Sequence, residues 1–407
     1  MNVLVLNPGS NSLKAELVRC QGGQKTASEG EKLISLMVEG IGREATLSRL
    51  RGKEAEHSES MAAQNYGEAA SGLLRWLDQR REGGLPGLDE TGCVGVRVVH
   101  GGALFTGPSR ITPEVEQQIL ELGKWAPLHN RSSVDILPAI RSRLPQVAIY
   151  GVFDTAFHRT IPDTAGLYAI PADLAAKHAI RRYGFHGISH RYMLERSASL
   201  AGRESARISA VTMHLESGCS VTAVAHGRSI DNTMGLTPLE GLMMGTRSGD
   251  VDPALIPFLV ESEGLPLSEV MEVLNKRSGL LGVSGRSLDT RVLMKEYDTD
   301  ARVKLAMEMF SYRVTKAVGA SLAALGSAEA VIFGGGIAEN TPLVRERVCA
   351  GLRWCGLEMD EEQNRRLIDI EGRLSTPDSR IQAYVIPVEE GLQIAHECCQ
   401  AIKEVAA

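Results

Sequence analysis

Residues 2–18, NVLVLNPGSNSLKAELV, decide the fold of this chain. The apolar run at residues 3–6 predicts a buried strand, residues 7–12 are a cluster of turn residues, and a second apolar segment covers residues 15–18. No helix fits between the two strands, so the stretch predicts a β-hairpin. Its turn offers backbone N–H groups and hydroxyls, and Lys14 follows. These are groups that hold phosphate oxygens, although a polar turn without a ligand explains the pattern equally well.

Composition limits the class of protein. The chain has 407 residues, 43% hydrophobic and 23% charged, which predicts a globular protein of two or three domains. A net charge of -6 without a long basic stretch argues against a nucleic-acid partner. No apolar run reaches the ~18 residues of a membrane span, and the N-terminus enters a strand instead of a signal peptide. Seven cysteines without CxxC spacing predict reduced thiols and a cytoplasmic location.

The first half of the chain alternates predicted strands and helices. We expect strands near residues 33–38, 44–50, 93–99 and 147–153, helices at 61–82, 113–124 (with Thr112 as N-cap) and 133–144, and a loop at 126–130. This alternation predicts a mostly parallel or mixed sheet with helices packed on it.

The second half repeats the opening pattern. Residues 209–215 predict a strand, residues 216–220 a turn and residues 221–225 a second strand, as in residues 2–18. This predicts a duplicated α/β domain, each copy presenting its first hairpin turn to a shared cleft. Beyond it we expect helices over most of 253–325 and at 342–354 and 389–405, with strands at 330–333 and 384–386.

Glycine-rich loops are the first candidate ligand sites, because glycine lets a ligand approach the backbone closely. They cover residues 241–250, 282–287 and 334–336, and a tight turn is the alternative explanation for the last. Arg247 lies inside one of these loops. Arg97 interrupts an apolar strand, where it either binds a ligand or has only the structural role of a salt-bridged arginine. Two such arginines suit a carboxylate or other oxyanion, because each guanidinium can bind two oxygens.

Other polar residues have both a structural and a functional explanation. Asp154 ends a predicted strand, where it would be catalytic or a helix N-cap. His186 and His190 have i, i+4 spacing without an HExxH motif, so we expect contact with an anion instead of a metal. Glu389 and Glu390 either stabilise the first turn of a helix or contact Mg²⁺.

Four segments together resemble the acetate kinase family: residues 153–163, FDTAFHRTIPD; 180–192, IRRYGFHGISHRY; 231–253, DNTMGLTPLEGLMMGTRSGDVDP; and 334–352, GGGIAENTPLVRERVCAGL. The resemblance extends over nearly the whole chain. It implies an α/β fold of two duplicated actin-like (ribonuclease H-like) domains with an interdomain cleft. The expected domains are residues 1–152 with 387–407, and residues 153–386, which would bind nucleotide. It also implies reversible phosphoryl transfer between ATP and a short-chain carboxylate, with Mg²⁺ or Mn²⁺, in a homodimer.

The resemblance implies individual roles as well. Asp154 would be the catalytic acid or base group, and His186 and Arg247 would stabilise the transition state. Arg97 would bind the carboxylate, and the residues lining its methyl pocket would be Val99, Leu128 and Pro238. Lys14 would meet the ATP phosphates, and Asn7 and Glu390 would hold the metal. Three loops would hold the nucleotide: His214, Leu215, Glu216, Ser217 and Gly218; Asp289, Thr290 and Arg291; and Gly336, Ile337, Ala338, Glu339 and Asn340.

The chain departs from the family in the second phosphate loop, where the family has His-Leu-Gly-Asn-Gly and this chain has Glu216 and Ser217 at the third and fourth positions. An added charge at ~4 Å and an effective dielectric of ~20 would cost about 4 kcal/mol. Asn11, Val96, Ala338 and Val388 also depart from the family pattern. Acetate kinase is therefore the main prediction. The alternatives are a propionate or other short-chain carboxylate kinase, a pyrophosphate-dependent variant, and a weakly active nucleotide-binding paralogue.

Overall fold

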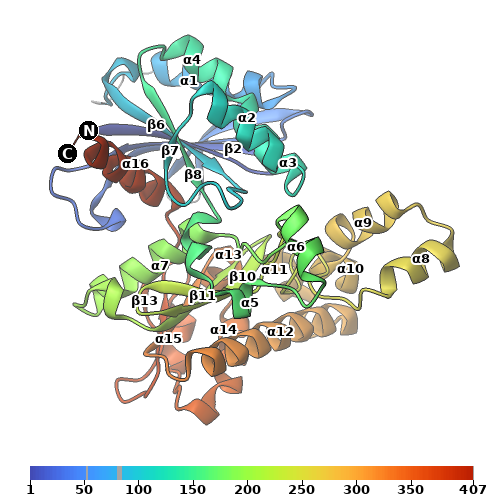
Figure 1. The fold of residues 1–407 in the computed structure, drawn as a ribbon. Coiled ribbons are helices and arrows are strands. Elements are labelled where there is room, and N and C mark those ends of the chain that lie inside the picture. The colour runs from blue at the N-terminus through green and yellow to red at the C-terminus, as the bar shows by residue number, and fades with distance from the viewer. Residues whose placement is uncertain (52–53, 80–84, 407) are drawn as a thin grey trace. The chain divides into compact units, whose positions relative to one another are not determined.

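The computed structural model describes residues 1–51, 54–79 and 85–406. The chain forms two compact units: unit 1 is Met1–Phe157 with Glu389–Ala407, and unit 2 is His158–Val388. Figure 1 labels the helices and strands of each unit. Within the described residues, no helix combines the length and the apolar character needed to cross a membrane.

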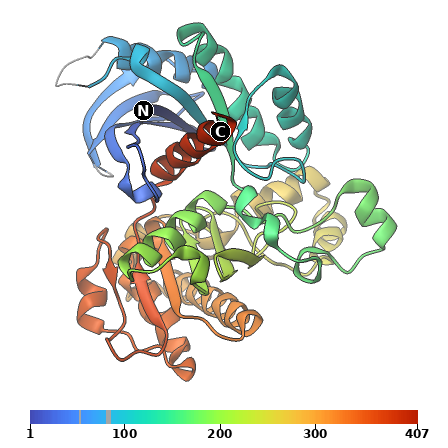
Figure 2. The same cartoon turned by 60° about the vertical axis from the view of Figure 1, so that its left-hand side comes forward.

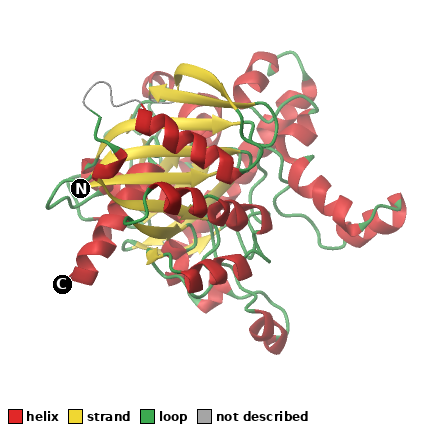
Figure 3. Cartoon of the chain, turned by 90° about the horizontal axis from the view of Figure 1, so that it is seen from above, coloured by secondary structure: helices red, strands yellow, loops and turns green. Residues whose placement is uncertain are grey.

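Unit 1 contains an eight-stranded mixed sheet in the order β5-β4-β3-β2-β1-β6-β8-β7, visible as yellow arrows in Figure 3. Its strands are β1 (Asn2–Pro8), β2 (Ser12–Arg19), β3 (Glu31–Glu39), β4 (Ala45–Arg51), β5 (Glu54–Met61), β6 (Thr91–Val98), β7 (Ser109–Arg110) and β8 (Ala148–Phe153). The predicted opening hairpin is confirmed, because β1 and β2 pair antiparallel and Gly9 N donates to Ser12 O at 2.8 Å. β6 runs parallel to both β1 and β8.

Helices cover both faces of this sheet because alternate residues of β1 are buried on opposite sides. Leu4 and Leu6 join a core with residues of the helices α1 (Tyr66–Gln79) and α4 (Leu137–Arg143). The closing helix α16 (Glu390–Ala406) packs on β1 and β6, as the red helix in Figure 2 shows. There Gly95 of β6 has no room for a side chain, since a Cβ would lie 2.7 Å from Ile394. The other helices of unit 1 are α2 (Pro113–Leu122) and α3 (Pro127–Asp135).

Unit 2 contains a six-stranded sheet in the order β11-β10-β9-β12-β14-β13. Its strands are β9 (Ala210–Leu215), β10 (Cys219–Ala225), β11 (Arg228–Asn232), β12 (Ala330–Gly334), β13 (Gly372–Arg373) and β14 (Gln382–Val385). β9, β10 and β11 are antiparallel neighbours, and β12 runs parallel to β9 and β14. The run β3-β2-β1-β6-β8 of unit 1 has the same order and directions. The predicted duplication of an α/β domain is therefore confirmed.

Helices make up most of the rest of unit 2. They are α5 (Asp163–Gly166), α6 (Ala172–His178), α7 (Gly187–Leu200), α8 (Leu255–Glu263), α9 (Leu267–Lys276), α10 (Gly279–Ser284), α11 (Thr290–Glu296), α12 (Ala301–Leu325), α13 (Gly336–Asn340), α14 (Pro342–Gly351) and α15 (Glu361–Arg366). The long helix α12 packs on β9 and β10. The expectation that helices dominate residues 253–325 is confirmed.

Three local predictions were wrong. Residues 126–130 are mostly not a loop, since α3 begins at Pro127, a residue suited to the first helical position. The helix expected at 133–144 is divided between α3 and α4, with Pro138 in the first turn of α4. The helix expected from residue 61 begins at Tyr66, because the polar strand β5 occupies Glu54–Met61, and residues 80–82 of that helix lie outside the described residues.

Candidate active site

In unit 1, the carboxyl ends of the parallel strands β6 and β8 bring Arg97 and Asp154 together. Arg97 Nε donates to both Asp154 oxygens at 3.1 Å, and Arg97 Nη2 donates to Oδ2 at 2.6 Å. The Asp154 side chain is 1% exposed and that of Arg97 is 16% exposed. A guanidinium so little exposed needs a partner, and this carboxylate supplies it. The arginine that interrupts an apolar strand is thus salt-bridged and still partly accessible.

Asn7 and Glu390 complete this cluster from β1 and from the first residue of α16. Asn7 Oδ1 accepts from Arg97 Nη1 at 3.1 Å, and Asn7 Nδ2 donates to Glu390 Oε2 at 2.7 Å. Glu390 Oε2 also lies 3.8 Å from Arg97 Nη1. Amide and carboxylate oxygens are ligands of the kind that Mg²⁺ prefers. Among the described residues, no group of three or more His, Cys, Asp or Glu side chains could hold a metal ion.

Lys14 belongs to a second charged group of unit 1. Its Nζ lies 3.1 Å from Glu16 Oε1, and Lys32 Nζ lies at the same distance from that oxygen. Although burial acts to raise it, the two lysines hold the pKa of Glu16 below its ordinary value. Of the expected methyl-pocket residues in unit 1, Val99 is buried. Leu128 lies in α3, and its side chain is outside the described part of the structure.

In unit 2, His186 and Arg247 converge on Gly218, next to the turn between β9 and β10. A Cβ on Gly218 would lie 3.3 Å from Arg247 Nη1 and 3.3 Å from His186 Nε2, so a side chain at this position would crowd both groups. Arg247 Nη1 donates to the carbonyl oxygen of Pro238 at 3.1 Å. His186 precedes α7 with φ of 58°, a left-handed conformation that is uncommon for residues with a side chain.

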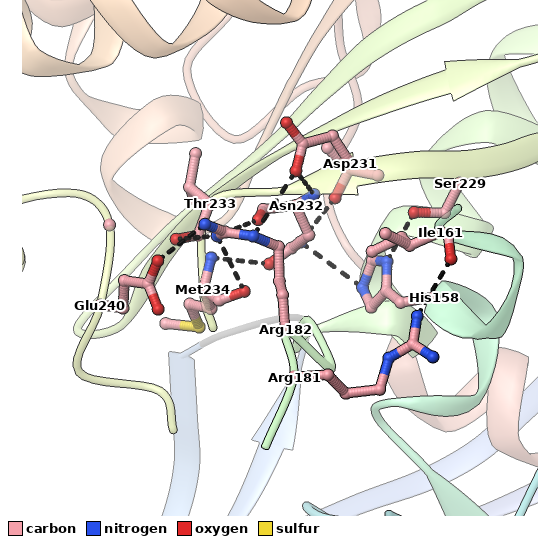
Figure 4. Close-up of polar contacts among 12 residues, drawn as sticks. His158, Ile161, Arg181, Arg182, Ser229, Asp231, Asn232, Thr233, Met234 and Glu240 are labelled. Atoms are coloured by element: carbon pink, nitrogen blue, oxygen red, sulfur yellow. Dashed lines mark hydrogen bonds and ion pairs between the residues drawn. The ribbon is translucent and has the colours of Figure 1, made fainter. Parts of the chain in front are cut away.

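A polar cluster that includes His158, Ser229 and Asn232 (Figure 4) bonds the backbone of Phe185, just before His186. His158 Nε2 is 2.9 Å from Phe185 O, and its Nδ1 is 2.8 Å from Ser229 Oγ. Asn232 Oδ1 accepts from Phe185 N at 3.4 Å. Burial lowers the pKa of His158 to about 4, so this ring is neutral at pH 7. Hydrogen bonds within unit 2 thus hold the backbone that leads into the left-handed residue His186.

The second phosphate loop lies against the loop before α13. The rings of His186 and His214 are 4.3 Å apart, and His214 Nε2 is 3.4 Å from Glu216 Oε2. A Cβ on Gly336 would lie 4.0 Å from Glu216 Oε1, so the Glu216 carboxylate lies between His214 and Gly336. Its side chain is 60% exposed. Glu216 therefore lies among residues expected to contact nucleotide.

The side chain of Glu339, a predicted nucleotide contact, bonds backbone groups of unit 2. Its side chain is buried, and Oε1 accepts from Gly335 N at 2.7 Å and from Val388 N at 3.1 Å. Ile337 and Ala338 are buried beside it. Asn340 Nδ2 donates to Gly336 O at 3.1 Å. The Glu339 carboxylate thus shapes the glycine loop by holding its backbone.

The Asp289–Arg291 segment connects to this loop. Asp289 caps α11 by accepting from Arg291 N at 2.8 Å, and its hydrogen bonds with the Arg291 side chain lower its pKa. Thr290 Oγ1 is 3.0 Å from Thr341 Oγ1, which directly follows α13. The structure therefore brings this segment and residues 336–340 together.

One residue of this region was not predicted from the sequence. Arg345 is fully buried, and its Nη1 donates to the carbonyl oxygens of Ala338 at 2.7 Å and Glu339 at 2.9 Å. Burial lowers its pKa to about 10. In the sequence, Arg345 is one charged residue among several in a predicted helix. Nothing there indicates that it faces inward.

The model of the Acetokinase family matches residues 2–396. Together with the duplicated α/β fold and with the guanidinium and imidazole groups beside a hairpin turn, this match defines a phosphotransferase with a carboxyl group as acceptor. An acetate kinase of Solibacter usitatus is 45% identical over 410 residues, covering 99% of this chain and 98% of its own. One of Thermotoga maritima is 40% identical over 408 residues, covering 100% of both chains. This chain belongs to the acetokinase family, and the resemblance seen in the sequence is confirmed.

Solved structures agree with this assignment. The crystal structure of acetate kinase from Porphyromonas gingivalis has a TM-score of 0.90 and 37% identity, and covers 98% of this chain and 99% of its own. A propionate kinase from Francisella tularensis has a TM-score of 0.87 and 34% identity, with 97% and 98% coverage. Both neighbours are thus similar to this chain in fold and in sequence.

Proposed function

We propose that this chain transfers the γ-phosphoryl group of ATP reversibly to acetate, giving acetyl phosphate and ADP. The observation that supports this most directly is the convergence of His186 and Arg247 on Gly218. A carboxylate acceptor is already ionised at pH 7, so the main barrier is repulsion between two anions. Fixed positive charge and N–H donors at the transferred group lower that barrier.

The remaining residues are proposed to bind the two substrates. Arg97 binds the acetate carboxylate, and Asp154 holds the Arg97 guanidinium in a fixed plane through three hydrogen bonds. Lys14 and the three loops of unit 2 bind ATP. The proposed domains are an N-terminal actin-like domain, residues 1–152 with 387–407, and a C-terminal nucleotide-binding domain, residues 153–386.

A magnesium ion fits the oxygen atoms of Asn7 and Glu390. Mg²⁺ is often held by one or two carboxylates together with waters and substrate phosphates, so a cage of protein ligands is not required. When bound, the ion would neutralise phosphate charge. The Glu390 carboxylate and the Asn7 amide lie within hydrogen-bond distance of each other, and Arg97 lies beside both. Before a substrate binds, the positive charge of the Arg97 guanidinium partly balances the negative charge of the Glu390 carboxylate.

A cytoplasmic homodimer is part of the proposal. All seven cysteines are free, which suits a reducing compartment. The helix α8 has the sequence LIPFLVESE and buries none of its residues within this chain. Its Phe258 is 59% exposed. An apolar helix of this kind supports self-association.

Replacing Arg247 with Ala tests the proposed function. We expect kcat for acetyl phosphate formation to fall by at least ~100-fold, the usual loss on removing one preorganised electrostatic group. Arg277→Ala, which removes an exposed arginine paired with Glu269, is the matched control and should retain activity. Near-normal turnover of Arg247→Ala would refute its role.

Steady-state assays of the unaltered protein separate the alternatives. Acetate and propionate are compared as acceptors, because one methylene changes binding by only ~1–3 kcal/mol. ATP and pyrophosphate are compared as donors. Turnover with pyrophosphate alone would replace ATP in the proposal, and no turnover with either donor would favour the nucleotide-binding paralogue.

A further inference from the structure

Behind His186, three buried side chains continue a chain of hydrogen bonds that starts at its ring and stays within unit 2. His186 Nδ1 is 2.8 Å from Ser220 Oγ, and that oxygen is 2.8 Å from His190 Nε2. His190 Nδ1 is 2.7 Å from Thr212 Oγ1. Thr212, Ser220 and His190 are each 0% exposed. The series of hydrogen bonds thus begins at Thr212 on β9, passes through His190 on α7 and Ser220 on β10, and ends at the proposed catalytic imidazole of His186.

The His190 ring is neutral at pH 7. Burial lowers its pKa well below the ordinary value, and the nearby rings of His158 and His214 act in the same direction. A neutral imidazole has one N–H donor and one acceptor nitrogen. Therefore the hydrogen bonds at its two nitrogens must point the same way along the chain, either toward His186 or away from it.

Thr212 decides between the two directions. Its only hydrogen-bond partner among the described residues is His190 Nδ1. A buried hydroxyl that does not donate its proton costs about 1–3 kcal/mol. Thr212 avoids this cost only by donating to His190 Nδ1. His190 then donates from Nε2 to Ser220, and Ser220 donates its own proton to His186 Nδ1.

We propose that Thr212, His190 and Ser220 are positioning residues that fix His186 as the tautomer with its proton on Nε2. The inference rests on the proposed function, in which His186 acts at the transferred phosphoryl group. Nε2 is the ring nitrogen on the side of Gly218 and Arg247. The chain of hydrogen bonds therefore keeps a hydrogen-bond donor on that side, where an anion needs one.

Protonation of His186 would reverse every bond in the chain. A protonated Nδ1 of His186 would donate to Ser220 Oγ, and Ser220 would then donate to His190 Nε2. The proton of the neutral His190 ring would therefore lie on Nδ1 and would be donated to Thr212. Among the described residues of unit 2, the charged and titratable groups near this region include His158, His190 on α7, His214 on β9, Glu216 in the turn and Arg247. The tautomer of His190 thus reports the protonation of His186.

Long-range proton–nitrogen NMR spectra of the histidine rings test the proposal directly in the full-length, ligand-free protein at pH 7.5. The spectra are assigned with His186→Gln and His190→Gln variants. We expect protonated Nε2 and unprotonated Nδ1 in both rings. A proton on Nδ1 of either ring at this pH would overturn the proposal.

Thr212→Val removes the donor while conserving shape, and Thr212→Ser restores it. We expect kcat to fall ~10-fold in Thr212→Val, less than the ~100-fold expected for loss of the donor itself, with the KM values unchanged. Thr212→Ser should recover most of this loss. Thr315→Val is the matched control, because Thr315 lies on α12 and its hydroxyl donates to the carbonyl oxygen of Ser311 within that helix. It should leave the His186 tautomer as it is.

These experiments distinguish an error in the positioning role of Thr212 from an error in the proposed kinase function. Unchanged spectra and unchanged kcat in Thr212→Val would refute the positioning role. An unaltered protein without phosphoryl transfer to any carboxylate would refute the function, whatever the tautomer. If Thr212→Val does not fold, the spectra of the unaltered protein still decide the direction of the chain.

Discussion

At the residue scale, Glu216 is the main departure from the family pattern. Its carboxylate lies near His214 and Gly336, where phosphate would bind, but it is 60% exposed. Exposure raises the effective dielectric, so its repulsion of an anion at ~4 Å lies between about 1 kcal/mol in water and about 4 kcal/mol near a protein surface. We therefore expect this loop, with the Glu216 carboxylate in it, to bind ATP at reduced affinity.

The double variant Glu216→Gly, Ser217→Asn tests this reasoning. We expect its KM for ATP to fall by at least ~5-fold, the ratio that corresponds to about 1 kcal/mol, because the repulsion is removed. The KM for acetate should stay the same. Glu272→Gln, which neutralises an exposed carboxylate on α9, is the control. An unchanged KM for ATP would show that the Glu216 carboxylate does not weaken ATP binding.

Residues that conflict with their local pattern could be predicted from the sequence. Arg97 interrupts an apolar strand, and this conflict is visible without a structure. Arg345, Thr212 and Ser220 fit their local patterns, and only tertiary contacts give them a role. Arg345 bonds carbonyl oxygens of α13 that it reaches only when α14 packs, and Thr212 meets His190 across two different elements. Contacts that depend on such packing leave no signal in one sequence.

At the element scale, the hairpins were predicted correctly because their signals are local. Turn residues and short apolar runs specify β1–β2 and β9–β10. β5 was missed because its residues, EAEHSESM, are almost all polar and it pairs with only one neighbour, β4. α3 was missed because its nine residues, PLHNRSSVD, include few strong helix formers. Elements that depend on packing against the rest of a sheet were thus the least predictable.

Acid should destabilise unit 2 through His158, which bonds the backbone just before His186. His158 is neutral and fully buried in the folded state with a pKa of about 4, against an ordinary value near 6.5. Below pH 6.5 the unfolded chain binds this proton and the folded unit does not, so the stabilisation present above pH 6.5 is lost as the pH falls toward 4. We expect the free energy of unfolding to fall by about 2 kcal/mol between pH 7 and pH 5.

Urea unfolding of the full chain at several pH values, followed by circular dichroism, measures this loss. In His158→Gln, which lacks the titrating group, the pH dependence over the same interval should be smaller by about 2 kcal/mol. His226→Gln is the control, because His226 is an exposed histidine in the turn after β10. Equal slopes in His158→Gln and the unaltered protein would contradict the assignment.

At the scale of the whole molecule, α8 is an apolar helix without a fully buried residue, since its side chains are partly buried or exposed. Figures 1 and 3 show helices of unit 2 that extend away from its sheet, α8 and α9 among them. α9 follows α8 directly and carries Leu267, which is 58% exposed. A stable protein interface buries about 800 Å² on each partner, so α8 alone is too small and α9 would have to contribute. Self-association through α8 and α9 would remove this apolar surface from water.

Phe258→Asp should therefore weaken the proposed homodimer. Removing an aromatic anchor from the centre of an interface costs about 2 kcal/mol or more, which raises the dimer Kd at least ~30-fold, and the added carboxylate increases that cost. Sedimentation velocity over a range of protein concentrations measures the change. Ile370→Asp is the matched control, since Ile370 is a similarly exposed apolar residue outside α8 and α9 and its replacement should leave the dimer intact. A variant with the mass of the unaltered dimer would exclude α8 as the interface, and an unaltered protein that stays monomeric would exclude the homodimer itself.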